Sequence, residues 1–262
     1  MRILISNDDG YLSPGLAALE RAASSMSDDV WTIAPEVKRS SMGHSISLHE
    51  AFTLRQLGPR RYACSGTPAD CAIAGMAWIF AETDKPDLVL SGVNDGRNIG
   101  EDVVYSGTLS IAREAAFWGI PAISFSAPNK MNFDAPEMAS WLADVVRGLA
   151  CDMDNWHLPD EWLSINLPSK APAPLRHAVP GRAKIAGKIV AESKDGQSTV
   201  LRYLKGRTGV PVPGDEATLL DAGFATIYRL RWNGYARLED AFLDKLNSNT
   251  SGVSLNLKSD PK

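Results

Sequence analysis

The chain has 262 residues, of which 44% are hydrophobic and 22% charged, with a formal net charge of −4. This is the composition of an ordinary soluble globular protein, and it lacks the basic surface that long nucleic acids require. Three scattered cysteines are too few for a disulfide framework or a zinc cluster. No apolar run reaches membrane-spanning length and no signal peptide precedes the first strand, so we expect a cytoplasmic protein with no membrane partner.

The first part of the chain alternates short apolar runs with helical patterns. Residues 3–5 (Ile-Leu-Ile) predict a buried strand, and Ser13-Pro14 predicts the start of a helix that ends near Met26. Residues 30–34 predict a second strand, which right-handed crossover makes a parallel neighbour of the first. Further strands are expected at 87–92, 121–125 and 163–168, and further helices after Thr67, after Thr108 and from Glu137. The order predicts an α/β fold with a mostly parallel sheet and flanking helices.

Two other regions have different patterns. Residues 45–49 and 52–55 alternate polar and apolar side chains ahead of Gly58-Pro59, which predicts an antiparallel ribbon. Beyond the prolines of residues 169–183, strand-like runs at 184–205 and 223–232 predict a β-rich extended region. A last helix is expected at 236–246, and a mobile tail at 247–262.

The stretch Asn7-Asp8-Asp9-Gly10 directly follows the first predicted strand. Adjacent carboxylates repel each other and favour neither strand nor core. Open α/β sheets bind ligands at the carboxyl ends of their strands, where two carboxylates would suit a hard divalent cation. A polar turn, with an aspartate capping the next helix and a glycine at positive φ, explains the same residues equally well.

Further polar clusters follow other predicted strands or the loops that these strands feed. Because strand ends at one edge of a parallel sheet converge, residues far apart in sequence could share a single cation. Two carboxylates, a hydroxyl and an amide carbonyl form an oxygen shell that suits Mg²⁺ or Mn²⁺. The residues are Asp8, Asp9, Ser40 and Asn94.

The stretch Ser106-Gly107-Thr108 lies where a helix is expected to begin. Backbone N–H groups and the helix dipole would hold a phosphate there, and a water activated by the metal would attack the phosphorus. Simpler interpretations stay open for each residue. Ser106 could be an N-cap, Asn94 a left-handed turn residue and Ser40 an ordinary loop serine. His44 could donate a proton to a leaving group or serve as a structural hydrogen-bonding residue.

Five blocks of the sequence, in this order, resemble the SurE survival-protein family. The resemblance covers residues 1–168 and closes with the strand-like stretch at 163–168. It implies a Rossmann-like α/β core and a metal-dependent phosphatase of nucleoside 5′- and 3′-monophosphates. The blocks are Asn7-Asp8-Asp9-Gly10, Ala34-Pro35 with Arg39-Ser40 and Gly43-His44-Ser45, Gly66-Thr67-Pro68-Ala69-Asp70-Cys71, Ser91-Gly92-Val93-Asn94 and Tyr105-Ser106-Gly107-Thr108.

The resemblance also implies roles for single residues and an assembly. The metal ligands would be Asp8, Asp9, Ser40 and Asn94, and the catalytic residues Asp8, Asp9 and Asn94. Apart from the resemblance, the positions of the residues lead us to expect that Asn7, Ser106, Gly107, Thr108 and His44 bind substrate and phosphate. An extended C-terminal element would be exchanged within a homodimer or homotetramer. We therefore expect a catalytic core at 1–168, an oligomerisation region packed on it at 169–246 and a flexible tail at 247–262.

Two alternative functions stay open at this point. In phosphatases of the haloacid-dehalogenase type an aspartate is itself phosphorylated, but those enzymes carry Asp-x-Asp after the first strand, whereas Asp8 and Asp9 are adjacent. The other alternative is a non-catalytic nucleotide or metal sensor, because a fold does not determine a function.

Overall fold

The computed structural model describes residues 1–185, 188–204, 206–209, 212–234 and 239. Its internal contacts divide the chain into two units, Met1–Trp232 and Asn233–Lys262. All the elements described below belong to the first unit. Apart from residue 239, the helix expected at 236–246 and the tail expected at 247–262 lie outside the described residues. In the described part of the chain, no helix is long and apolar enough to span a membrane.

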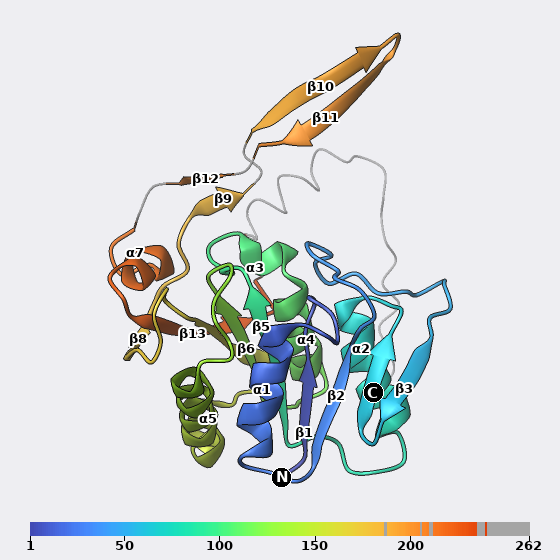
Figure 1. The fold of residues 1–262 in the computed structure, drawn as a ribbon, viewed down its shortest axis with the longest axis vertical. Coiled ribbons are helices and arrows are strands. Elements are labelled where there is room, and N and C mark those ends of the chain that lie inside the picture. The colour runs from blue at the N-terminus through green and yellow to red at the C-terminus, as the bar shows by residue number, and fades with distance from the viewer. Residues whose placement is uncertain (186–187, 205, 210–211, 235–238, 240–262) are drawn as a thin grey trace. The chain divides into compact units, whose positions relative to one another are not determined.

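A nine-stranded sheet forms the centre of the first unit, in the order β3-β4-β2-β1-β5-β6-β7-β13-β8 (Figure 1). Its middle strands run parallel to one another, as predicted, and the α/β fold is confirmed. The parallel middle strands are β1 (Ile3–Ser6), β2 (Val30–Pro35), β5 (Leu88–Asp95), β6 (Ala122–Ala127) and β7 (Glu161–Asn166).

Helices cover both faces of this sheet because the inner strands are apolar on both sides. Successive side chains of β1 alternate between faces: Ile3 and Ile5 belong to one core cluster and Leu4 to the other. The first cluster lies under α1 and α5, and the second lies under α2, its π-helical continuation and α4. These helices are α1 (Pro14–Ser24), α5 (Pro136–Cys151), α2 (Pro68–Ala74), η1 (Gly75–Ile79) and α4 (Gly107–Phe117).

The predicted ribbon after β2 exists, but its strands lie further along the chain: of residues 45–49 and 52–55, only Leu54 and Arg55 belong to it. β3 (Leu54–Gly58) pairs antiparallel with β4 (Arg61–Cys64), and β4 joins the sheet parallel to β2. The strand-like reading of residues 45–49 was wrong, because they form a loop. The backbone N–H and the hydroxyl of Ser47 donate to the carboxylate of Asp70, at 3.0 and 2.7 Å. Asp70, in the first turn of α2, thus accepts the backbone N–H of Ser47, which a neighbouring strand would otherwise accept.

The C-terminal part of the first unit completes the sheet and adds smaller ones. β13 (Ala225–Arg231) pairs antiparallel with β7, and β8 (Leu175–His177) lies at the outer edge. Two further pairs of antiparallel strands are separate from the large sheet, as Figure 1 shows. The remaining elements are α3 (Asp102–Tyr105), α6 (Met153–Trp156), β9 (Ala183–Ile185), β10 (Ile189–Asp195), β11 (Ser198–Tyr203), β12 (Arg207–Gly209) and α7 (Glu216–Asp221).

Candidate active site

The turn after β1 is closed by the side chain of Asn7, which is fully buried. Its amide nitrogen donates to the carbonyl of Gly10 at 3.1 Å and to the hydroxyl of Ser13 at 2.6 Å. Its carbonyl oxygen accepts the N–H of Gly10, whose φ of 101° favours glycine. Asn7 therefore determines how the two aspartates leave the strand, and a contact with phosphate stays a prediction for this residue.

Asp8 is buried against the N-terminus of α4 and is only 4% exposed. The hydroxyl of Thr108 donates to its carboxylate. Gly107 lies so close that a Cβ at that position would be 2.7 Å from the Cβ of Asp8. Burial raises the pKa of Asp8 to about 6, the hydrogen bond from Thr108 lowers it, and the charge of Asp9 raises it. The negative charge of Asp8 is thus costly here, and a cation beside it would offset that cost.

Asp9 makes different contacts, although it is the next residue. Its carboxylate accepts the backbone N–H of Asp95 at 2.8 Å and forms an ion pair with the ammonium of Lys38. The side chain of Asp9 is 6% exposed and that of Lys38 is 53% exposed. The hydrogen bond to Asp9 is the largest cause that raises the pKa of Lys38. The charge of Asp9 is therefore partly neutralised within the protein, in contrast to that of Asp8.

Backbone contacts bring the other two predicted ligands to the same edge. The N–H of Arg39 donates to the carbonyl of Asp8 at 2.7 Å, which ties the loop carrying the exposed Ser40 to the aspartate turn. Asn94 lies near the end of β5, the strand next to β1. Its amide nitrogen donates to the carbonyl of Gly96 at 2.8 Å, so its carbonyl oxygen is the atom that would coordinate a cation.

These donors fit the predicted metal. Two carboxylates with low exposure, a hydroxyl and an amide carbonyl are the oxygen ligands that Mg²⁺ and Mn²⁺ take in proteins. The unfavourable charge of Asp8 gives a further reason for a cation at this point.

Ser106 is the N-cap of α4, as the simpler interpretation predicts. Its hydroxyl accepts the backbone N–H of Leu109 at 3.2 Å. The carbonyl of Thr108 accepts the hydroxyl of Ser91 at 2.7 Å, which ties the first turn of α4 to β5. The helix begins beside Asp8, so its N-terminal N–H groups and its dipole face the candidate cation site.

The structure does not bring His44 to this group. Its Nε2 lies 2.8 Å from a carboxylate oxygen of Glu114, and its ring stacks on Phe117 with a centroid distance of 5.4 Å. Glu114 is about 10 Å along the helix from Gly107, at 1.5 Å per residue. In this position the histidine anchors the loop after β2 to α4, and its role as a proton donor stays a prediction.

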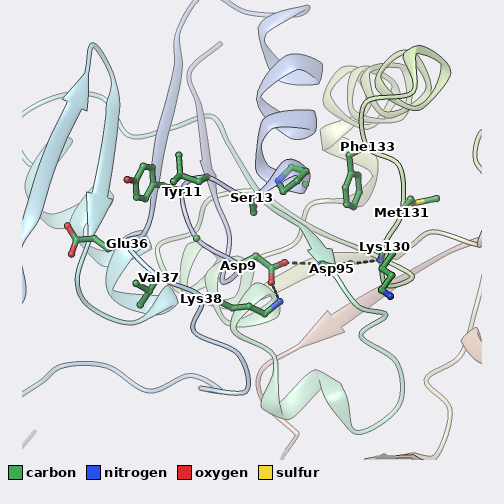
Figure 2. A pocket seen from close by; sticks show the side chains of 14 residues that line it. Asp9, Tyr11, Ser13, Glu36, Val37, Lys38, Asp95, Lys130, Met131 and Phe133 are labelled. Carbon is green, nitrogen blue, oxygen red and sulfur yellow. Dashed lines mark hydrogen bonds and ion pairs between the residues drawn. The ribbon is translucent and has the colours of Figure 1, made fainter.

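A cavity of about 440 Å³ opens on the other side of Asp9, next to α1 (Figure 2). Its lining includes residues that are not among the predicted site residues: Lys38, Asp95, Lys130 and Phe133. Lys38 and Asp95 could have been found, since they lie two residues before Ser40 and one after Asn94. Lys130 and Phe133 follow β6 in a stretch without a recognisable pattern.

Comparison with known proteins decides the family. The family model described as "Survival protein SurE" matches residues 3–186. The chain belongs to the SurE family. The resemblance of the five sequence blocks is thereby confirmed, and the match extends past residue 168.

The relatives match nearly the whole chain. The protein named 5′-nucleotidase SurE from Bradyrhizobium sp. (strain ORS 278) is 37% identical over 95% of this chain and 99% of its own. The protein of the same name from Rhodopseudomonas palustris (strain BisB18) is 36% identical with the same coverage. The crystal structure of the SurE protein from Aquifex aeolicus superposes with a TM-score of 0.77 at 30% identity, covering 95% of this chain and 99% of that one. The similarity to this family therefore extends beyond residue 186.

Proposed function

We propose that this SurE-family chain is a divalent-metal-dependent phosphomonoesterase that hydrolyses nucleoside 5′- and 3′-monophosphates. The observation that carries the proposal is the packing of Asp8 against the N-terminus of α4. A helix N-terminus attracts a phosphate, whereas two carboxylates beside it repel one. A bound cation would resolve this conflict and would also favour the charged form of Asp8.

The residues of the site would divide the work as follows. Asp8, Asp9, Ser40 and Asn94 would hold the metal, which when bound polarises a phosphoryl oxygen and activates water. The backbone N–H groups at Gly107 and Thr108 would orient the phosphate at the start of α4. Thr108 would also keep the carboxylate of Asp8 in place through its hydroxyl.

The relatives named 5′-nucleotidase SurE support nucleoside 5′-monophosphates as the substrates. Enzymes of the haloacid-dehalogenase type, which form an aspartyl-phosphate, carry Asp-x-Asp after the first strand. Because Asp8 and Asp9 are adjacent, they argue against that mechanism.

The experiment is a hydrolysis panel with the purified full chain. Nucleoside 5′- and 3′-monophosphates would be offered with Mg²⁺, with Mn²⁺, with EDTA, and with EDTA followed by excess metal. We expect phosphate release that EDTA removes and metal restores. Release that is indifferent to EDTA would contradict the metal, and a protein that binds nucleotides but releases no phosphate would contradict the activity.

We also propose that residues 169–246 contribute to a homodimer or homotetramer. The ribbon of β10 and β11 supports this, because all its residues are exposed. Its large apolar side chains are between 40% and 62% exposed, which favours burial against a second copy. They are Ile189, Val190, Val200, Leu201 and Tyr203. Sedimentation of the wild type beside a variant with Leu201→Lys and Tyr203→Lys would test this; a monomeric wild type would contradict it.

A further inference from the structure

We propose that the cavity beside Asp9 is the subsite for the nucleoside part of the substrate, with the base packed against Tyr11 and Phe133. The inference rests on the proposed nucleotidase function, because it assigns the part of the substrate that is not phosphate. The cavity of about 440 Å³ lies within the range of about 300–1,000 Å³ that is usual for small-molecule sites.

The cavity is connected to the candidate metal site by hydrogen bonds. Asp9 lines the cavity and accepts the N–H of Asp95, whose own carboxylate accepts the N–H of Lys130 at 2.7 Å. Figure 2 shows these contacts, which run from Asp9 through Asp95 to Lys130. It also shows the ion pair between Lys38 and the carboxylate of Asp9. A ligand in the cavity would therefore be adjacent to a residue that we expect to hold the metal.

The walls of the cavity combine rigid apolar groups with polar ones. Phe133 is 5% exposed and belongs to the core cluster under α1 and α5, while Tyr11 and Met131 pack against the same cluster. Because these side chains are fixed by the core, the apolar surface is formed before a ligand binds. Aromatic side chains on such a surface bind bases by stacking, which tolerates every base because each has a π-face.

Cationic side chains lie at the same cavity. The ammonium group of Lys38 is held by Asp9, and the side chain of Lys130 also lines the cavity. The backbone of Lys130 has a φ of 63°, and the bond from its N–H to Asp95 stabilises this left-handed conformation. Lysine donors complement the oxygen and nitrogen acceptors of a base and a ribose.

The two aspartates divide the substrate between the two faces of the sheet. Asp8 contacts α4, whose N-terminus suits a phosphate, whereas Asp9 contacts the cavity next to α1. A nucleoside monophosphate would cross the sheet edge over these residues, with its phosphate toward α4 and its nucleoside toward α1. Asp9 thus takes part in both the metal site and the subsite.

The test removes one aromatic wall and compares two esters. Phe133→Leu keeps an apolar side chain but no ring, and Phe80→Leu is the matched control in the opposite core cluster. Adenosine 5′-monophosphate would be compared with ribose 5-phosphate, which lacks the base. We expect Phe133→Leu to raise the KM for the nucleotide about tenfold and to leave that for ribose 5-phosphate within about twofold. Phe80→Leu should leave both KM values, for the nucleotide and for ribose 5-phosphate, at the wild-type level.

Binding of adenosine alone gives a readout that does not need hydrolysis. Equilibrium dialysis should show binding by the wild type and by Phe80→Leu, and about tenfold weaker binding by Phe133→Leu and by Tyr11→Leu. If no ester is hydrolysed but this binding pattern holds, the proposed function fails and the subsite stands. If nucleotides are hydrolysed while Phe133→Leu and Tyr11→Leu keep wild-type KM and adenosine binding, the subsite is overturned and the proposed function stands.

Discussion

The surroundings of Asp8, beside α4, differ from those of Asp9, beside α1, although the two residues are adjacent in the chain. On the α4 side, Asp8 is enclosed by Gly107 and Thr108, with no room for an additional methyl group. On the α1 side, Asp9 borders an open cavity with lysine side chains and aromatic walls. A pair of adjacent aspartates can therefore serve both faces of the sheet, because successive side chains at a strand end diverge.

The same comparison separates the two charges. The negative charge of Asp8 is disfavoured mainly by burial, and its pKa is raised to about 6. The negative charge of Asp9 is instead paired with the ammonium of Lys38. Neutral amide variants of the two residues should therefore agree in activity but differ in stability.

The largest effect is expected for activity in Asp8→Asn and Asp9→Asn. Each variant loses a charged ligand of the metal, and we expect hydrolysis of nucleoside monophosphates to be abolished. Changes in groups that merely orient ligands already cost about 10- to 100-fold. Steady-state kinetics with Mn²⁺ present, alongside circular dichroism, would measure this. Asp144→Asn, at an exposed position on α5, is the control, and wild-type turnover in either of the first two variants would contradict the metal assignment.

The next effect concerns the pH dependence of stability in the metal-free protein. The pKa of Asp8 is about 6 in the folded chain against an ordinary value of 3.8, so the folded state binds the proton more tightly than the unfolded state. This stabilisation is complete below the lower value and is lost as pH rises through the higher one. The loss is about 3 kcal/mol, at 1.36 kcal/mol per pKa unit.

Asp8→Asn removes this titration and can still accept the hydrogen bond from Thr108. With EDTA present, we expect the stability advantage of Asp8→Asn over the wild type to grow between about pH 4 and pH 7. Urea unfolding at several pH values would measure it, with Asp144→Asn as control. A stability difference that does not change with pH would show that the pKa of Asp8 is not raised in the folded protein.

The sequence predicted the parallel sheet because its strands are uninterrupted apolar runs, and it predicted the helix starts because Ser13, Thr67 and Ser106 cap them. It misplaced the ribbon because the alternation at residues 45–49 has the period of a strand, while their hydrogen bonds go to the cap of α2. A local pattern cannot indicate which distant group will take these bonds.

The candidate site was predictable to a similar extent. The aspartate turn, Ser40 and Asn94 were predicted to lie together because each lies near the end of a strand, or in the loop after one, at the same edge of the sheet. The cavity was not, because Phe133 and Lys130 belong to the stretch between β6 and α5, and their contribution depends on packing against α1 and on the bond to Asp95. His44 contacts Glu114 and not the aspartates. The sequence alone does not indicate which carboxylate lies beside this histidine in the fold.

A smaller effect is expected from Gly107→Ala, which tests the closeness of the α4 side. Its Cβ would lie 2.7 Å from the Cβ of Asp8 and 2.8 Å from the Cγ of Pro68, so either both neighbours or the start of α4 must move. We expect a loss of about 1–3 kcal/mol in unfolding free energy together with reduced activity. Gly148→Ala is the matched control, since nothing lies within 4 Å of its Cβ and α5 should gain up to about 1 kcal/mol. Equal effects of the two changes would contradict the close packing.

The smallest effect is expected from Thr108, which would act through Asp8. Thr108→Val removes the donor to a buried carboxylate, so the pKa of Asp8 should rise further, and at a given pH a smaller fraction of Asp8 should be charged and held in place to bind the metal. We expect about tenfold weaker Mn²⁺ binding in calorimetry and a shift of the acidic limb of the kcat/KM profile to higher pH. Thr108→Ser keeps the hydroxyl and should retain the wild-type profile. If Thr108→Val lowered activity without moving that limb, the threonine would act by packing alone. The pKa of Asp8 would then not depend on the hydroxyl of Thr108, and the electrostatic difference between Asp8 and Asp9 would be contradicted.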